Sequence, residues 1–216
     1  IVPFSIDENT NRKKLQEGQK EKNSIKISTS AQALGLHLLM KNQPQHALPY
    51  FSQALEAAVK SKDVKTEIEI FAKIGLAYRL LHQNEKALDY LKDAHQKNKS
   101  ITSRETDDYI LSQLAQVSFE LNDLKSAEEY YIRVSKSFAT QKKNTLAAIS
   151  LNSLGELQLR NNDYNKSMES FKSALTHVAS NENTLNGIIH RNLGLVFFKK
   201  GKFEMALEQF NKSLTF

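Results

Sequence analysis

Small and bulky apolar residues recur along this chain at an interval of about forty positions. A small residue follows a leucine or isoleucine, a second small residue comes twelve positions later, a bulky residue four after that, and a compact residue three further on. The first column holds Gly35, Gly75, Ala115, Gly155 and Gly194; the second, Ala47, Ala87, Ala127, Ser167 and Ala206; the third, Phe51, Leu91, Tyr131, Phe171 and Phe210; the fourth, Ala54, Ala94, Val134, Ala174 and Ser213. Four columns in register across five copies predict a repeat protein.

Within each copy, the apolar positions have helical spacing. The second copy has a stripe at i, i+3, i+4 and i+7, formed by Phe71, Ile74, Gly75 and Tyr78. A short polar break such as HQNE (82–85) follows, and its Asn residue is typical of a helix end. Each copy therefore predicts a helix, a tight turn and a second, antiparallel helix. Because one such pair cannot bury its apolar stripe alone, the copies are expected to stack.

The spacing predicts ten helices in five pairs. They are expected at 28–41 with 44–61, 64–82 with 84–99, 104–121 with 123–140, 144–160 with 163–180, and 184–200 with 203–216. Residues 1–27 are polar and lysine-rich, which favours an arm or a frayed helix. The last helix carries an apolar stripe with no polar capping helix after it, so we expect a longer natural chain and self-association through this repeat.

The columns resemble the tetratricopeptide repeat, and FAKIGLAYRLLHQNEKALDYLKDA (71–94) is similar to that pattern throughout. The resemblance covers about residues 28–216, although the period exceeds the roughly 34 residues usual for the family. Forty-residue versions are similar to those of spindle-orientation adaptors, bacterial peptide-sensing regulators and sensor-kinase ectodomains. The resemblance implies an all-α solenoid of five antiparallel helix pairs forming a right-handed superhelix. The expected repeats are 28–67, 68–107, 108–147, 148–186 and 187–216, the last incomplete.

Residues that would carry catalysis are hard to find. The chain has no cysteine, which excludes disulfides, thiolate metal sites and cysteine nucleophiles. Its six histidines form no i, i+4 pair, and no glycine-rich phosphate loop or GxSxG motif occurs. We therefore expect no catalytic residue, no metal and no cofactor, and a protein that is not an enzyme.

Charge and hydropathy narrow the partners. The net charge is +6, but the basic and acidic residues are interleaved, so we expect no binding to nucleic acid. No apolar run is long enough to span a bilayer, so we expect no membrane contact by this segment. The compartment stays open between the cytoplasm, which we favour slightly, and a periplasmic sensor ectodomain.

The resemblance implies a peptide groove, because the first helices of this family line the concave face where peptides usually bind. The helical phase selects side chains after each leucine–glycine pair and three positions before the small residue. The candidate groove residues are Leu76, Arg79, Gln116, Phe119, Asn152, Glu156, Leu159, Arg191, Leu195 and Phe198. Arg79 and Arg191 favour an acidic or carboxylate-bearing ligand. The alternative is that some of these leucines contact neighbouring helices instead of a ligand.

Together these features predict a non-catalytic protein- or peptide-binding scaffold, the sensing or docking part of a larger signalling protein. The alternative is a peptide-pheromone-responsive regulator of the tetratricopeptide class. Such regulators usually carry an amino-terminal helix-turn-helix or helical bundle, and residues 1–27 are too short for either.

Overall fold

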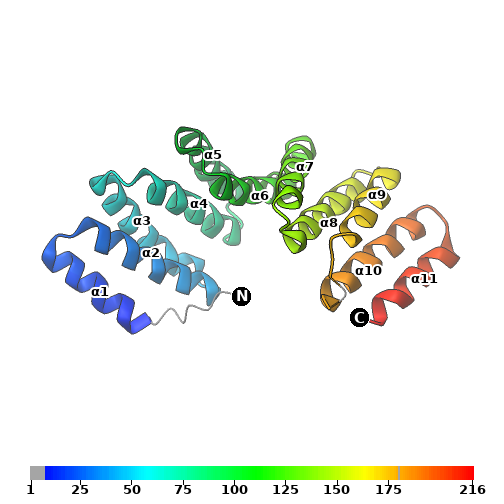
Figure 1. Ribbon diagram of the computed structural model, residues 1–216, viewed down its shortest axis with the longest axis horizontal. Helices are drawn as coiled ribbons and strands as arrows, with labels where there is room; N and C mark the ends of the chain where they lie inside the picture. The colour runs from blue at the N-terminus through cyan, green and yellow to red at the C-terminus, as the bar shows by residue number, and fades with distance from the viewer. Residues whose placement is uncertain (1–7, 180) are drawn as a thin grey trace. The chain divides into compact units, whose positions relative to one another are not determined.

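The computed structural model describes residues 8–179 and 181–216, and the regular elements within those ranges are all α-helices (Figure 1). They are α1 (Glu8–Glu21), α2 (Ser24–Met40), α3 (Pro44–Ser61), α4 (Val64–Leu80), α5 (Asn84–Ile101), α6 (Arg104–Glu120), α7 (Leu124–Thr140), α8 (Asn144–Arg160), α9 (Tyr164–Leu175), α10 (Asn183–Lys199) and α11 (Phe203–Leu214). The chain divides into two compact units, Ile1–Val117 and Ser118–Phe216. The predicted all-α repeat fold is confirmed.

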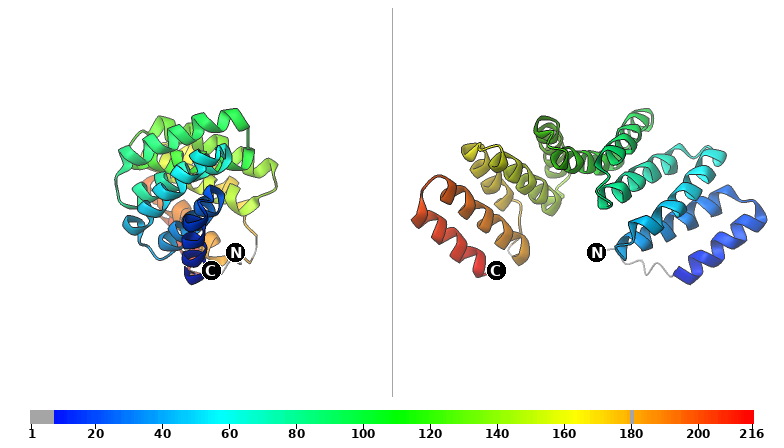
Figure 2. Two further views of the ribbon diagram at one scale, coloured as in Figure 1. Left: turned by 90° about the vertical axis from the view of Figure 1, so that its left-hand side faces the viewer. Right: turned by 180° about the vertical axis from the view of Figure 1, so that it is seen from behind.

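Within each unit, consecutive helices lie side by side and reverse direction, as the front view of Figure 1 and the rear view of Figure 2 show. In the first unit α2 packs on α3 and α4 on α5, and in the second unit α8 packs on α9 and α10 on α11. Second helices also contact the first helix of the next copy, as α3 does with α4 and α9 with α10. Each apolar stripe is therefore buried by two neighbours.

The turns explain this regularity. A residue with left-handed backbone follows every helix from α2 to α8, with φ between +50° and +64°. These residues are Asn42, Lys62, His82, Thr102, Asn122, Lys142 and Asn162, twenty positions apart. Such a residue ends a helix and lets the backbone N–H groups that follow bond to its last carbonyls. Asp63 and Asp123 then cap the next helices by accepting bonds from Thr66 N and Ser126 N.

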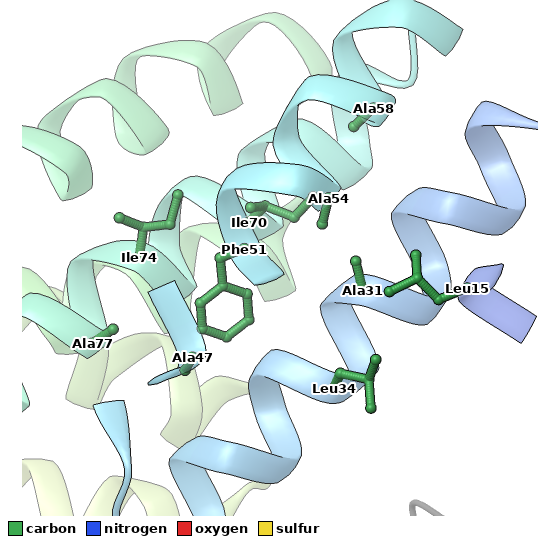
Figure 3. Close-up of a cluster of buried hydrophobic side chains, with 10 residues drawn as sticks. All are labelled: Leu15, Ala31, Leu34, Ala47, Phe51, Ala54, Ala58, Ile70, Ile74 and Ala77. Carbon is green, nitrogen blue, oxygen red and sulfur yellow. The ribbon is translucent and has the colours of Figure 1, made fainter. Parts of the chain in front are cut away.

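The columns of small and bulky residues contact each other inside each pair. A Cβ atom placed on Gly155 would lie 2.6 Å from the ring of Phe171, and the other three glycine copies give 2.5–2.7 Å. The glycine therefore lets the two helices approach, while the bulky residue fills the space opposite it. Figure 3 shows this packing in the first copy, where Phe51 lies among the buried residues of α2, α3 and α4.

The amino-terminal segment differs from its expected form as a polar arm or frayed helix. Residues 8–21 form helix α1, which packs on α2. Leu15 joins the buried cluster of the first unit, and Gly18 lies so close to α2 that its Cβ would be 3.1 Å from Ile27 N. Residues 1–7 lie outside the described residues. Helix α2 correspondingly begins at Ser24 rather than at 28.

The fourth copy also differs, because α9 ends at Leu175 and not near 180. The segment after it contains Thr176 and Val178, whose branched side chains lower helix propensity. Asn186, which is buried on α10, holds the loop that follows, since its Nδ2 donates to the carbonyls of Ala179 and Glu182 at 3.2 Å each. A shaped loop therefore replaces the last turns of the expected helix.

Candidate functional site

A hydrogen-bonded network joins the first helices α8 and α10 of the second unit. The Nδ2 atom of Asn192 donates to Asn152 Oδ1 at 3.0 Å and to Glu156 Oε1 at 2.8 Å. Asn152 Nδ2 donates to the same Glu156 oxygen at 3.0 Å. Asn152 and Asn192 are buried, so their amides need these partners. Two amides from two helices thus hold one carboxylate in a fixed position.

Arg191 and two apolar residues continue this stripe along α10. Arg191 is exposed, and its Nη2 atom lies 3.4 Å from Asn192 Oδ1. Leu195 and Phe198 follow at helical spacing and are 39% and 53% exposed. Because large apolar side chains are usually buried, their exposure beside an arginine marks this stripe as a candidate contact surface.

A cavity of about 560 Å³ lies beside the network. Its apolar lining comes from Ile149 on α8 and from Leu185 and Ile188 on α10, and Asn152 lines it as well. The loop after α9 forms another wall and is tied to α8, because Thr145 Oγ1 donates to the Glu182 carboxylate. An apolar hollow with a few fixed polar groups is the usual form of a ligand site.

No protein-family model matches the chain, and no curated protein matches its sequence. Solved structures do match. BtubC from P. vanneervenii superimposes with a TM-score of 0.84 at 16% identity, over 98% of this chain and 91% of that one. A signal-transduction ATPase with numerous domains and a tetratricopeptide repeat sensor, from Pyrococcus horikoshii, gives 0.85 at 17% identity, over 97% of this chain and 33% of that one. YrrB, described as a tetratricopeptide protein with an unusual peptide-binding site, gives 0.65 at 15%, over 93% and 91%. The chain has a tetratricopeptide-type repeat fold.

In the second unit of this tetratricopeptide-type fold, the structure brings several predicted groove residues together. Asn152 and Glu156 belong to the network described above, and Arg191 and Leu195 extend it along α10. Phe198 lies further along α10 and packs edge-on against Phe203, with ring centroids 5.6 Å apart.

Two other predicted residues of the second unit are held within the protein. Leu159 packs against the buried cluster that includes Phe171 and Ile189. The guanidinium of Arg160 lies 5.0 Å above the ring of Phe119 and donates to the Phe119 carbonyl at 3.5 Å. For Leu159 the structure therefore favours the alternative in which a leucine contacts neighbouring helices.

The first unit contains the remaining predicted residues, Leu76 and Arg79 on α4 and Gln116 on α6, all half-buried. Arg79 lies near Tyr109 of α6: burial raises the pKa of the Tyr109 hydroxyl, and the charge of Arg79 opposes that rise. The arginine thus lies beside a buried aromatic residue of the next first helix.

Some residues of the site were not among the predicted ones. Ile149 lies one turn before Asn152 on the same stripe of α8, and Ile188 lies in the same way before Arg191 on α10, so extending each stripe by a turn would have found both. Asn192 lies next to the selected column rather than in it, and only its burial identifies its role. The loop residue Glu182 carried no sequence signal, because a helix was expected to end nearby.

The histidines pair with single neighbours. His37 lies 3.0 Å from Glu8, His95 lies 2.9 Å from Asp107, and His190 lies 2.9 Å from Gln209. Across residues 8–179 and 181–216, no group of three or more acidic or histidine side chains could hold a metal ion. Among the helices that the structure describes, none is long and apolar enough to cross a membrane.

Proposed function

We propose that this chain is a non-catalytic protein- or peptide-binding scaffold, and that its ligand site includes the face formed by α8 and α10. The observation that carries the proposal is the fixed Asn152–Glu156–Asn192 network beside an open apolar cavity. Buried amides held in one orientation suit recognition of a peptide backbone, which offers N–H and C=O groups at regular intervals.

The cavity supplies the apolar part of this recognition. A ligand side chain that enters it would contact Ile149, Leu185 and Ile188. Asn152 lines the same cavity, and its two bonds to Glu156 and Asn192 use one donor and one acceptor of an amide that has more of both. In peptide sites a few anchors carry most of the affinity, while polar groups fix the register.

The charge next to the cavity favours an acidic ligand. Arg191 is exposed beside the network, and Glu156 already accepts bonds from two amides on its Oε1 atom. A guanidinium can bind a carboxylate through two parallel hydrogen bonds, which gives both affinity and orientation. We infer that the ligand places a carboxylate, from Asp, Glu or a chain terminus, close to Arg191.

The structural neighbours support a sensing or docking role. One neighbour contains a tetratricopeptide repeat sensor joined to other domains of a signal-transduction ATPase, and this chain covers a third of its length. Another is described as a peptide-binding tetratricopeptide protein. We propose by analogy that this chain is the ligand-binding part of a larger signalling protein.

A peptide-display selection tests the proposal, because it identifies peptide ligands directly on the intact chain. The selected peptides are synthesised, and their affinities are measured by calorimetry for the wild type, Ile149→Asp and Arg191→Glu. Lys172→Glu is the matched control, because Lys172 is an exposed cation on α9 that does not line the cavity.

We expect both site variants to weaken binding by about tenfold or more, whereas the control changes it less than about twofold. Circular dichroism confirms that all variants are folded. Affinity that is unchanged in Ile149→Asp and Arg191→Glu would place the ligand site elsewhere and reject the proposal.

A further inference from the structure

The last helix exposes a face that the other second helices cover. Leu207 and Leu214 on α11 are 60% and 84% exposed. Leu48 and Leu55 occupy the equivalent positions in the first copy, and both pack against the buried cluster that includes α4 residues. The same face in each earlier copy is therefore protected, and the face of α11 stands out against this internal reference.

The fourth copy identifies what covers this face. Met168 and Leu175, the counterparts of Leu207 and Leu214, pack against a cluster that contains Ile189, Leu193 and Val196 of α10. The covering element is thus an α-helix that presents an apolar stripe. Any occupant of the α11 face has to supply such a helix.

The exposed stripe of α11 is complementary to itself. It consists of Phe203, Leu207, Phe210 and Leu214, at intervals of four, three and four residues, so the spacing is the same in both directions. In an antiparallel pair of α11 helices, Phe203 therefore lies opposite Leu214 of the second copy, and Leu207 lies opposite its Phe210. Each aromatic ring meets a leucine, a match of larger with smaller side chains that packs well.

We propose that the α11 face is a dimerisation surface, which pairs with α11 of a second copy in this antiparallel register. Charges do not oppose it. Glu208 and Lys212 form an ion pair at 2.7 Å on the same helix, and the 100° rotation per residue directs both away from the stripe. Glu204 flanks the stripe, and the register brings it toward Asn211 of the second copy and not toward another acid.

A head-to-tail pairing of α11 with α1 fits less well. Helix α1 already directs its buried residues, Leu15 and Gly18, toward α2. The rest of α1, ENTNRKK before Leu15 and QE and QKE around Gly18, is polar or charged. An apolar stripe docked there would bury lysine, arginine and glutamate groups at a substantial cost. The second copy therefore meets α11 with its own α11.

Analytical ultracentrifugation over a wide concentration range tests the surface. The wild type is expected to form a dimer, and Leu207→Glu is expected to raise the dissociation constant by about tenfold or more, since it removes a buried leucine and adds a charge. Met205→Glu is the matched control, because Met205 is also exposed on α11 but lies on the opposite side of the helix from the stripe. A wild type that stays monomeric throughout, or a dimer that Leu207→Glu leaves intact, overturns the proposal.

Cysteine cross-linking tests the register, and the chain has no native cysteine to interfere. Phe203→Cys and Leu214→Cys change exposed side chains and are made in two differently tagged proteins. Mild oxidation of the mixture is expected to join the two different proteins, while each variant alone cross-links weakly. Strong cross-linking of each variant with itself would indicate a parallel pair and refute the antiparallel register. This proposal does not depend on the ligand site, because none of these substitutions touches the cavity residues.

Discussion

The contact between Gly155 and Phe171 offers a test in which local and tertiary effects have opposite signs. In an exposed helix interior, replacing glycine with alanine stabilises a protein by about 1 kcal/mol, because glycine loses more backbone freedom on folding. At Gly155, however, the new methyl group would lie 2.6, 2.7 and 2.9 Å from three ring carbons of Phe171, closer than real Cβ atoms come. Phe171 is fully buried, so its ring cannot turn away into solvent.

The packing effect should therefore exceed the helix propensity. Overpacking a core by one methyl group typically costs about 1–3 kcal/mol, and we expect Gly155→Ala to lower the free energy of unfolding by an amount in this range. Urea unfolding followed by circular dichroism measures it. Gly187→Ala on α10 is the control, because its nearest neighbour is the Ser213 carbonyl at 3.3 Å, near the end of the last helix. We expect that substitution to change stability by at most about 0.5 kcal/mol.

A double-mutant cycle isolates the contact. Phe171→Ala alone should cost about 3–5 kcal/mol through the cavity that it leaves. In the Gly155→Ala background the methyl group occupies part of that cavity, so the two effects should fall short of their sum by at least about 1 kcal/mol. If Gly155→Ala were as stable as the wild type, or if the two substitutions were additive, α8 and α9 would not approach each other at this residue.

Three further substitutions test turns and charges. His82 has a left-handed backbone with φ of 56°, so His82→Gly should raise the free energy of unfolding by about 0.5–1 kcal/mol, while His82→Ala should change it by less than about 0.5 kcal/mol; a loss of stability in the glycine variant would contradict the turn. Burial lowers the pKa of the Lys73 ammonium despite Glu69 at 3.7 Å, so the folded state binds fewer protons than the unfolded state as pH approaches 10.5, and wild-type stability should rise with pH in that window; Lys73→Met should remove this rise in thermal unfolding and be at least as stable at neutral pH. Hydrogen bonds from Arg12 and Lys41 lower the pKa of Glu8 from 4.5 to about 2, so its contribution is present above 4.5 and is lost as pH falls toward 2; Glu8→Gln should be less stable than the wild type at neutral pH, the gap should close near pH 2 in an acid titration, and a gap that does not vary with pH would exclude these bonds as the cause.

The helix pairs were predictable because their cause lies in a periodic pattern. A glycine in the first column and a large residue in the third, as at Gly155 and Phe171, have a single reason in all copies, which is the close approach of two helices. Helices α3 and α8 accordingly match their expected ranges to the residue. Helix α1 lacks such a pattern, since Leu15 and Gly18 are its only buried positions, and two positions cannot define a stripe.

The candidate site was predictable only in part. Helical phase selects Asn152, Glu156 and Arg191 correctly as neighbours on one face, because it depends on spacing alone. It does not show that Asn192 turns toward Asn152, since that depends on how α8 and α10 pack. It also does not predict the cavity, whose wall is a loop where the sequence pattern favoured continued helix.

Site-specific photo-cross-linking tests the central claim, peptide binding by the α8–α10 face, most directly. A benzophenone amino acid is placed at Ile149, which lines the cavity, and in a second protein at Lys172, which is exposed on α9 outside it. Both proteins are irradiated with the same display-selected peptide, and the products are quantified by mass spectrometry. Binding at this face predicts strong peptide labelling from position 149, suppressed by Arg191→Glu, and background labelling from position 172. Labelling from position 172 with none from 149 would contradict the claim.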